Sequence, residues 1–117
     1  MPIPEEKKII GQFRAEMENA YTEPLNSRHR YNASLYRSLL DTFGPEGTAV
    51  HLIDQDDIPY GLVELAKINM LYCSAEAIIL RPVYRIPDLP STPERREKAR
   101  RKLRVNFEYE APWDDEK

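Results

Sequence analysis

The sequence has few of the residues on which several common classes of protein depend. Its 117 residues include one cysteine, two histidines and four glycines. A single cysteine excludes a framework of internal disulfides. Because only two histidines are present to activate a thiol, we expect Cys73 to be a packing residue and not a nucleophile. No glycine-rich loop accompanies the acidic residues to cradle a phosphate. The sequence therefore predicts no catalytic residues, no bound metal and no cofactor.

Long apolar runs are also missing. No stretch approaches the length of a membrane span, and residues 1–8 contain acids and prolines where a secretory signal needs basic and then apolar residues. Charged residues make up 32% and hydrophobic residues 41% of the chain, as in ordinary soluble globular proteins. We expect a single cytoplasmic domain over residues 1–117 that ends in an acidic tail, 111–117, and has no membrane contact.

The charge is segregated along the chain, although the formal net charge is only −3. Residues 94–104 contain seven basic and two acidic residues, whereas residues 106–117 contain one basic and five acidic residues. A basic helix is a candidate for binding nucleic acid, and so is the basic, aromatic stretch 28–31. The candidate residues are Arg28, Arg30, Arg95, Arg96, Arg100 and Arg101. Acids on the outer face of the same helix favour the alternative that it is solvated and ion-paired, and the acidic tail can fold back on it.

Helical periodicity dominates the first third of the chain. Residues 4–21 place their apolar side chains on one side, and a second helix is predicted over 27–43, ending at Gly44 and Pro45. The apolar face of the first helix must pack against something, either the protein's own core or a partner. Its candidate partner-binding residues are Ile9, Ile10, Phe13 and Met17.

Alternating apolar residues predict strands over 48–53, 77–86 and 103–109, with Pro82 interrupting the second. Thr92, Pro93 and Glu94 predict the start of a helix over 93–104. The length of the apolar stretch 59–72 favours a helix, with a hairpin against 48–53 as the alternative. These elements predict an α/β or α+β fold in which two N-terminal helices pack on a small three-stranded sheet with intervening helices.

Amphipathic faces outnumber convergent polar groups in this sequence, so we expect a small non-enzymatic protein, an adaptor or regulator, that binds another protein or assembles with itself. One alternative is a nucleic-acid-binding accessory protein that uses the basic helix, with weak binding. A second alternative is a magnesium-dependent phosphoryl-transfer enzyme at the loop of Asp54, Asp56 and Asp57, because hard cations prefer oxygen ligands. Aspartates are also common in turns and helix caps, and we favour that interpretation of the loop.

Overall fold

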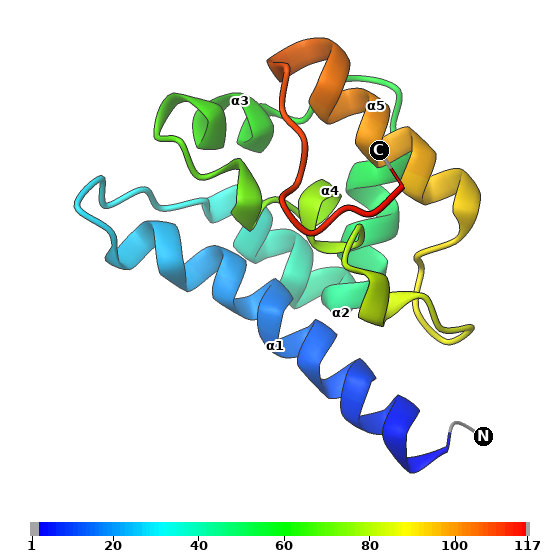
Figure 1. The fold of residues 1–117 in the computed structure, drawn as a ribbon. Helices are drawn as coiled ribbons and strands as arrows, with labels where there is room; N and C mark the ends of the chain where they lie inside the picture. The colour runs from blue at the N-terminus through cyan, green and yellow to red at the C-terminus, as the bar shows by residue number, and fades with distance from the viewer. Residues whose placement is uncertain (1–2, 117) are drawn as a thin grey trace.

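The computed structural model describes residues 3–116, and all the regular secondary structure in this part of the chain is helical (Figure 1). It contains five α-helices and two short 3₁₀-helices. In chain order these are α1 (Pro4–Asn26), α2 (Ser34–Asp54), α3 (Tyr60–Lys67), η1 (Leu71–Cys73), α4 (Ala75–Ile78), η2 (Pro82–Tyr84) and α5 (Pro93–Phe107). None of these helices is both long and apolar enough to cross a membrane.

The predicted α/β or α+β fold with a three-stranded sheet is wrong, because residues 3–116 contain no strand. Residues 48–53 belong to the second half of α2, residues 77–86 form the end of α4 and then η2, and α5 continues to Phe107. The reason is clearest at Ser74–Leu80, where every residue is buried. An alternation of polar and apolar residues indicates a strand only when one face of the strand meets solvent. An element that is covered on all sides has no such face, so the alternation here did not identify a strand.

The predicted helices are present in the structure, but their boundaries differ from the prediction. α1 and α5 begin at the prolines Pro4 and Pro93, and the hydroxyl of Thr92 caps α5 by accepting a hydrogen bond from the Arg95 N–H. The second predicted helix starts seven residues later than expected, at Ser34, so residues 27–33 form a loop. The 59–72 stretch is helical only over α3 and then η1, which excludes the hairpin alternative.

Gly44 and Pro45 kink α2 instead of ending it. Gly44 has φ 72° and ψ 174°, a backbone conformation that is open almost only to glycine. The chain then resumes a helix at Pro45, whose fixed φ suits a first helical position. The two halves of α2 can therefore face different neighbours.

Replacing Gly44 with alanine is expected to lower the free energy of unfolding by at least about 1 kcal/mol, because a side chain is strained at this φ and ψ. A Cβ at Gly44 meets no atom within 4 Å, so backbone strain and not steric clash causes the loss. Gly11 is the matched control, since a Cβ there is equally unobstructed and lies within α1. We expect Gly11→Ala to raise stability by about 0.5–1 kcal/mol, measured by urea unfolding.

The short helix α4 is the centre of the fold. α1, α2 and α5 all pack against it (Figure 1). Ser74 precedes the helix, and its hydroxyl accepts a hydrogen bond from the Ala77 N–H at 3.1 Å. This cap satisfies a backbone donor where no water reaches, which allows a helix of only four residues to lie in the core.

The C-terminal segment is part of the folded body and not a free tail. After Glu108, which has a left-handed backbone conformation, the chain turns back and runs across α4 (Figure 1). Ala111 and Asp114 are buried, and the Trp113 indole N–H donates to the Ala77 carbonyl at 2.7 Å. The guanidinium of Arg81 lies over the Trp113 ring, 3.7 Å from its centroid. The acidic residues at this end are thereby held in fixed positions.

Candidate functional site: a cavity between α2 and α3

A cavity of about 530 Å³ opens between α2, α3 and the region around α4. Its walls come from the loop before α2, from both halves of α2, from residues 59–65 and from residues 73–76. The kink at Gly44 lets the two halves of α2 contribute from different directions. This volume lies within the range of about 300–1,000 Å³ that is typical of ligand sites in proteins.

The mouth of the cavity carries large apolar side chains that face solvent. Leu35 is 70% exposed and Tyr60 is 63% exposed, and both residues line the cavity. Phe43 is 51% exposed and stacks on His51, another lining residue, with ring centroids 5.5 Å apart. We call Leu35, Phe43 and Tyr60 the apolar rim. Large apolar groups gathered around an opening are typical of surfaces that bind something.

A glutamate forms part of the inner wall of this apolar cavity. Glu76, in α4, is 1% exposed and lines the cavity. Its Oε2 atom has no hydrogen-bond partner among the residues that the structure describes. Burial raises the pKa of the Glu76 carboxyl, and a hydrogen bond from its own backbone N–H and the charge of Lys102 offset part of this effect. A buried polar atom without a partner costs free energy and therefore needs an explanation.

Lys102 of α5 is the basic group that acts on Glu76, but its hydrogen bonds go elsewhere. Its Nζ donates to the carbonyls of Leu52 and Ile53 at 2.9 and 3.0 Å. Burial lowers the pKa of Lys102, and the nearby Glu76 carboxylate opposes this shift. Lys102 thus moderates the cost of a charge on Glu76 and leaves Oε2 free to accept a hydrogen bond from another group.

Cys73 also lines the cavity, and its surroundings suit packing and not catalysis. The thiol is buried and donates to Glu23 Oε2 at 3.6 Å. Burial, together with the negative charge of Glu23, raises the pKa of the Cys73 thiol to about 12. Since the thiolate is the nucleophilic form, this cysteine is protonated and unreactive at neutral pH.

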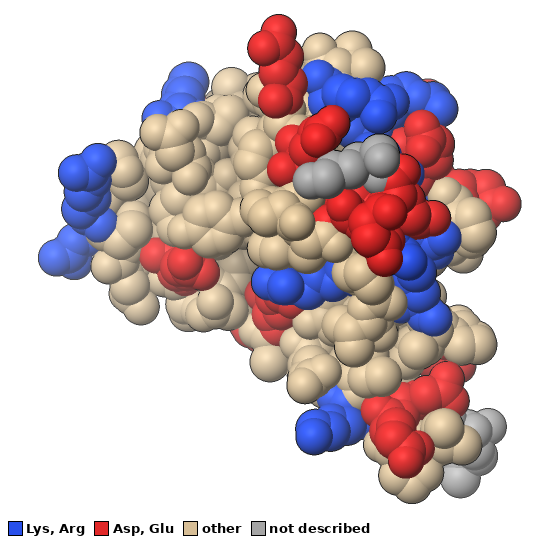
Figure 2. Space-filling view, viewed as in Figure 1, with Lys and Arg blue, Asp and Glu red and all other residues tan. Residues whose placement is uncertain are grey.

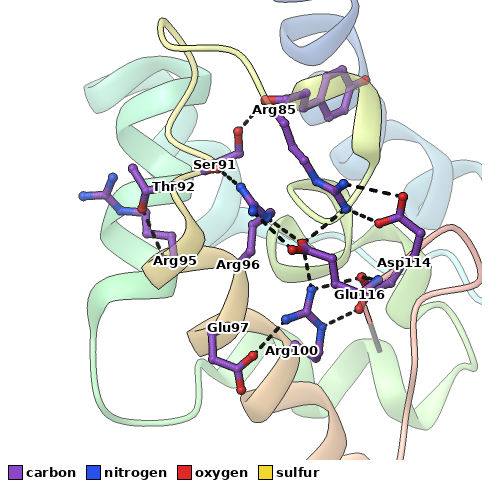
Figure 3. A network of polar contacts seen from close by, with 11 residues as sticks. Arg85, Ser91, Thr92, Arg95, Arg96, Glu97, Arg100, Asp114 and Glu116 are labelled. Carbon is purple, nitrogen blue, oxygen red and sulfur yellow. Dashed lines mark hydrogen bonds and ion pairs between the residues drawn. The ribbon is translucent and has the colours of Figure 1, made fainter.

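The candidate nucleic-acid residues of α5 lie close to carboxylates, as Figure 3 shows for Arg96 and Arg100. Arg95 makes two hydrogen bonds to Asp54, both of 2.9 Å, and Arg96 binds Glu116 at 2.7 Å. Arg100 is 7% exposed and binds Asp114 at 2.6 Å. Arg101 remains 63% exposed and lies 3.7 Å from Glu97. These contacts agree with the interpretation in which the basic helix is ion-paired.

The other two candidates lie far from this helix. Arg28 and Arg30 are exposed in the loop between α1 and α2, at the end of the molecule away from the first turns of α5 (Figure 1). Figure 2 shows basic side chains in separate groups on the face it presents, divided by acidic and uncharged residues. The structure does not bring these two basic segments together into one surface.

Two aspartates, one at the end of α2 and one just after it, also pair with α5. Asp54 binds Arg95 and Asp56 binds Lys98 at 3.1 Å, and the hydrogen bonds from Arg95 lower the pKa of Asp54. They do not converge on a shared position. Among residues 3–116, the carboxylates close enough to share a cation are those of Asp114, Asp115 and Glu116. All three of these already pair with arginines.

The apolar face predicted for the first helix is divided by the fold. Phe13 and Met17 have no exposed surface, and the Phe13 ring meets the Tyr84 ring edge to face at 5.3 Å. Ile9 and Ile10 are partly buried against the same core. The structure therefore assigns Phe13 and Met17 to the protein's own core and leaves them no surface for a partner.

Sequence reasoning missed Glu76 and the cavity. A signal was present, because Glu76 is the one charged residue in the stretch from Tyr72 to Leu80. Glu76 directly precedes the strand predicted over 77–86, and a half-buried strand there would leave an adjacent charged residue in water, so nothing marked Glu76 as unusual. Comparisons with protein-family models, with curated proteins and with solved structures find no match to this chain.

Proposed function

We propose that this protein is a small non-enzymatic binding protein that takes an apolar segment of a partner protein into the cavity between α2 and α3. The observation that carries the proposal is the apolar rim, in which the exposed Leu35 and Tyr60 line an open cavity and the exposed Phe43 stacks on the lining residue His51. Burying this rim against a partner removes apolar surface from water, which favours association by roughly 25 cal/mol for each Å². Surface aromatic and apolar side chains beside a pocket are also common anchors in interfaces.

The cavity walls support binding and not catalysis. Apolar residues of α2 and α3, such as Leu39, Leu62 and Leu65, supply much of the lining. The cysteine in the wall is a protonated thiol, and His51 stacks on Phe43 at the surface. A few polar groups in an otherwise apolar pocket orient a bound group without transforming it.

Site-specific photo-crosslinking tests the proposal. A photoreactive amino acid is placed at Leu35, in the rim, or at Val105, which is 69% exposed on α5 and serves as a control of matched exposure. After irradiation in cells of the source organism, we expect one protein to crosslink at position 35 and not at position 105. The captured protein is then purified and titrated against wild type, Leu35→Asp and Val105→Asp.

The expected result is that Leu35→Asp weakens the affinity by at least about tenfold, since a charge must then be buried in an apolar contact. Val105→Asp should leave it within about twofold, because an exposed position outside the contact contributes little. Equal effects of the two substitutions would contradict the site. Capture of a second copy of this chain would show self-assembly and contradict a separate partner.

A further inference from the structure

Glu76 gives the cavity a chemical preference that the apolar rim alone does not have. The carboxylate is 1% exposed and Oε2 is unpartnered among residues 3–116, yet Glu76 belongs to the wall of a cavity that opens to solvent. The cavity therefore lies beside a hydrogen-bond acceptor that no described residue uses, and because Oε2 is itself buried, a ligand reaches it when the Glu76 side chain turns toward the opening. The carboxylate accepts hydrogen bonds when ionised, and bonds to a charged donor are about twice as strong as neutral ones.

We propose that the group which enters this cavity has an apolar stem and a cationic end, and that its ammonium or guanidinium pairs with Glu76. The inference rests on the proposed function, because it names the part of the partner that the cavity holds. A lysine or arginine side chain has this form, with a flexible hydrocarbon stem and a charged head. The stem contacts leucines such as Leu39, Leu62 and Leu65, and the charged head pairs with Glu76.

Aromatic rings in the wall add to the preference for a cation. Tyr31, Tyr36 and Tyr60 all line the cavity. The faces of aromatic rings attract cations by about 0.5–1 kcal/mol at exposed sites and by more in desolvated ones. The Tyr36 hydroxyl already donates a hydrogen bond to the Met17 carbonyl at 2.6 Å. Tyr36 therefore lines the cavity without offering its hydroxyl donor to a competing anion.

Other ligand charges fit the same wall less well. The proposed pairing requires Glu76 to be ionised when the ligand is bound, and an anionic group would oppose that ionisation, because like charges in a low-dielectric site repel strongly. Lys102 does not reverse this argument, because its Nζ already donates to the backbone carbonyls of Leu52 and Ile53. A neutral hydroxyl can donate to Oε2, but the bond lacks the additional attraction between opposite charges.

A series of small probes with one stem and different heads tests the inference on the wild-type protein. Hexylammonium, hexylguanidinium, 1-hexanol and hexanoate are titrated separately, and binding is followed by the chemical shifts of backbone amides in α2, α3 and α4. We expect the cations to bind at least about tenfold more tightly than hexanol, and hexanoate to bind most weakly. The ratio between the two cations distinguishes a lysine-like from an arginine-like occupant.

Glu76→Gln is the matched variant, because glutamine keeps the shape of the side chain without the charge. It should remove the preference for cations, so that hexylammonium binds no more tightly than hexanol, whereas Glu94→Gln, at an exposed glutamate in the first turn of α5, should leave the preference unchanged. If hexanol and hexylammonium bind wild type equally well, the inference fails and the proposed apolar site stands. If no probe shifts these amides, the cavity binds no apolar group and both proposals fail.

Discussion

Replacing Asp114 with alanine is expected to lower the free energy of unfolding by about 3 kcal/mol. Asp114 and Arg100 form a buried pair whose side chains are 1% and 7% exposed. Two hydrogen bonds join them, Arg100 Nε to Oδ2 at 2.6 Å and Nη2 to Oδ1 at 3.0 Å. Removing the carboxylate leaves a guanidinium in the interior with part of its pairing lost.

The size of the effect follows from the neighbours of Arg100. Breaking a buried pair costs about 3–5 kcal/mol when the remaining charge is uncompensated. Glu97 and Glu116 still contact Arg100 at 2.9 and 3.2 Å, so we expect the lower end of this range (Figure 3). Asp114 also accepts the Glu116 N–H at 3.1 Å, and the loss of this bond loosens the segment that holds Glu116.

Urea unfolding followed by circular dichroism measures this change. Asp115→Ala is the matched control, because Asp115 is the next acidic residue but its side chain is 55% exposed where it binds Arg85. Exposed ion pairs contribute about 0–1 kcal/mol, so the control should lose less than about 1 kcal/mol. Equal losses in Asp114→Ala and Asp115→Ala would contradict the assignment of Asp114 to the core.

Glu76 is expected to make the protein less stable as the pH rises, relative to a Glu76→Gln variant. Burial raises the pKa of this carboxyl in the folded state, so the folded protein holds a proton that the unfolded chain releases. The stability of the folded state is then greatest below the ordinary pKa of a glutamate. It falls as the pH rises toward the raised value and levels off above it.

The comparison with Glu76→Gln isolates this effect from the rest of the molecule. Many paired carboxylates, including Asp54 and Asp114, have lowered pKa values and contribute stability that is lost in acid. Although burial on its own raises the pKa of Asp114, its hydrogen bonds with Arg100 and with the Glu116 backbone outweigh this. These groups are present in both proteins, so their contributions cancel in the difference.

Two other titratable groups act together with Glu76. Lys102 on α5 supplies a positive charge, and the buried phenol of Tyr36 on α2 has a raised pKa and stays neutral. Between about pH 4.5 and pH 8, the difference in unfolding free energy should move in favour of glutamine. The measurement is a series of urea titrations across this range. A difference that does not change with pH would show that the carboxyl is not desolvated.

Local sequence chemistry was sufficient to predict where some helices begin. The prolines at Pro4 and Pro93 and the cap at Thr92 act through neighbouring atoms, so their meaning does not depend on the rest of the chain. Gly44 and Pro45 were also recognised as a break. Their effect was misjudged, because whether a helix resumes after such a break depends on what the second half packs against.

The segments that were wrongly predicted as strands are those whose conformation depends on tertiary packing. The alternation in 77–86 suggested a strand, but an alternating pattern of a few residues fits several conformations where all sides are covered, as they are up to Leu80. In 103–109 the alternation did not mark a buried face, because Val105 is 69% exposed and residues 103–107 continue α5. The same limit applies to the site. The cavity is formed by residues of α2 and α3 with Glu76 from α4. No local sequence pattern predicts that these residues lie close together.

The position of α4 has a consequence for how the chain acquires its structure during synthesis. This four-residue helix packs against α1 and α2, which are made first, and against α5, which is made last. Isolated helices of this length are unstable in water, so α4 cannot hold its form until both sides are present. The core is therefore completed only after residues 93–116 have left the ribosome. Until then, the apolar side chains of Ala77, Ile78 and Leu80 are not fully covered, and such exposed apolar surface promotes aggregation or chaperone binding.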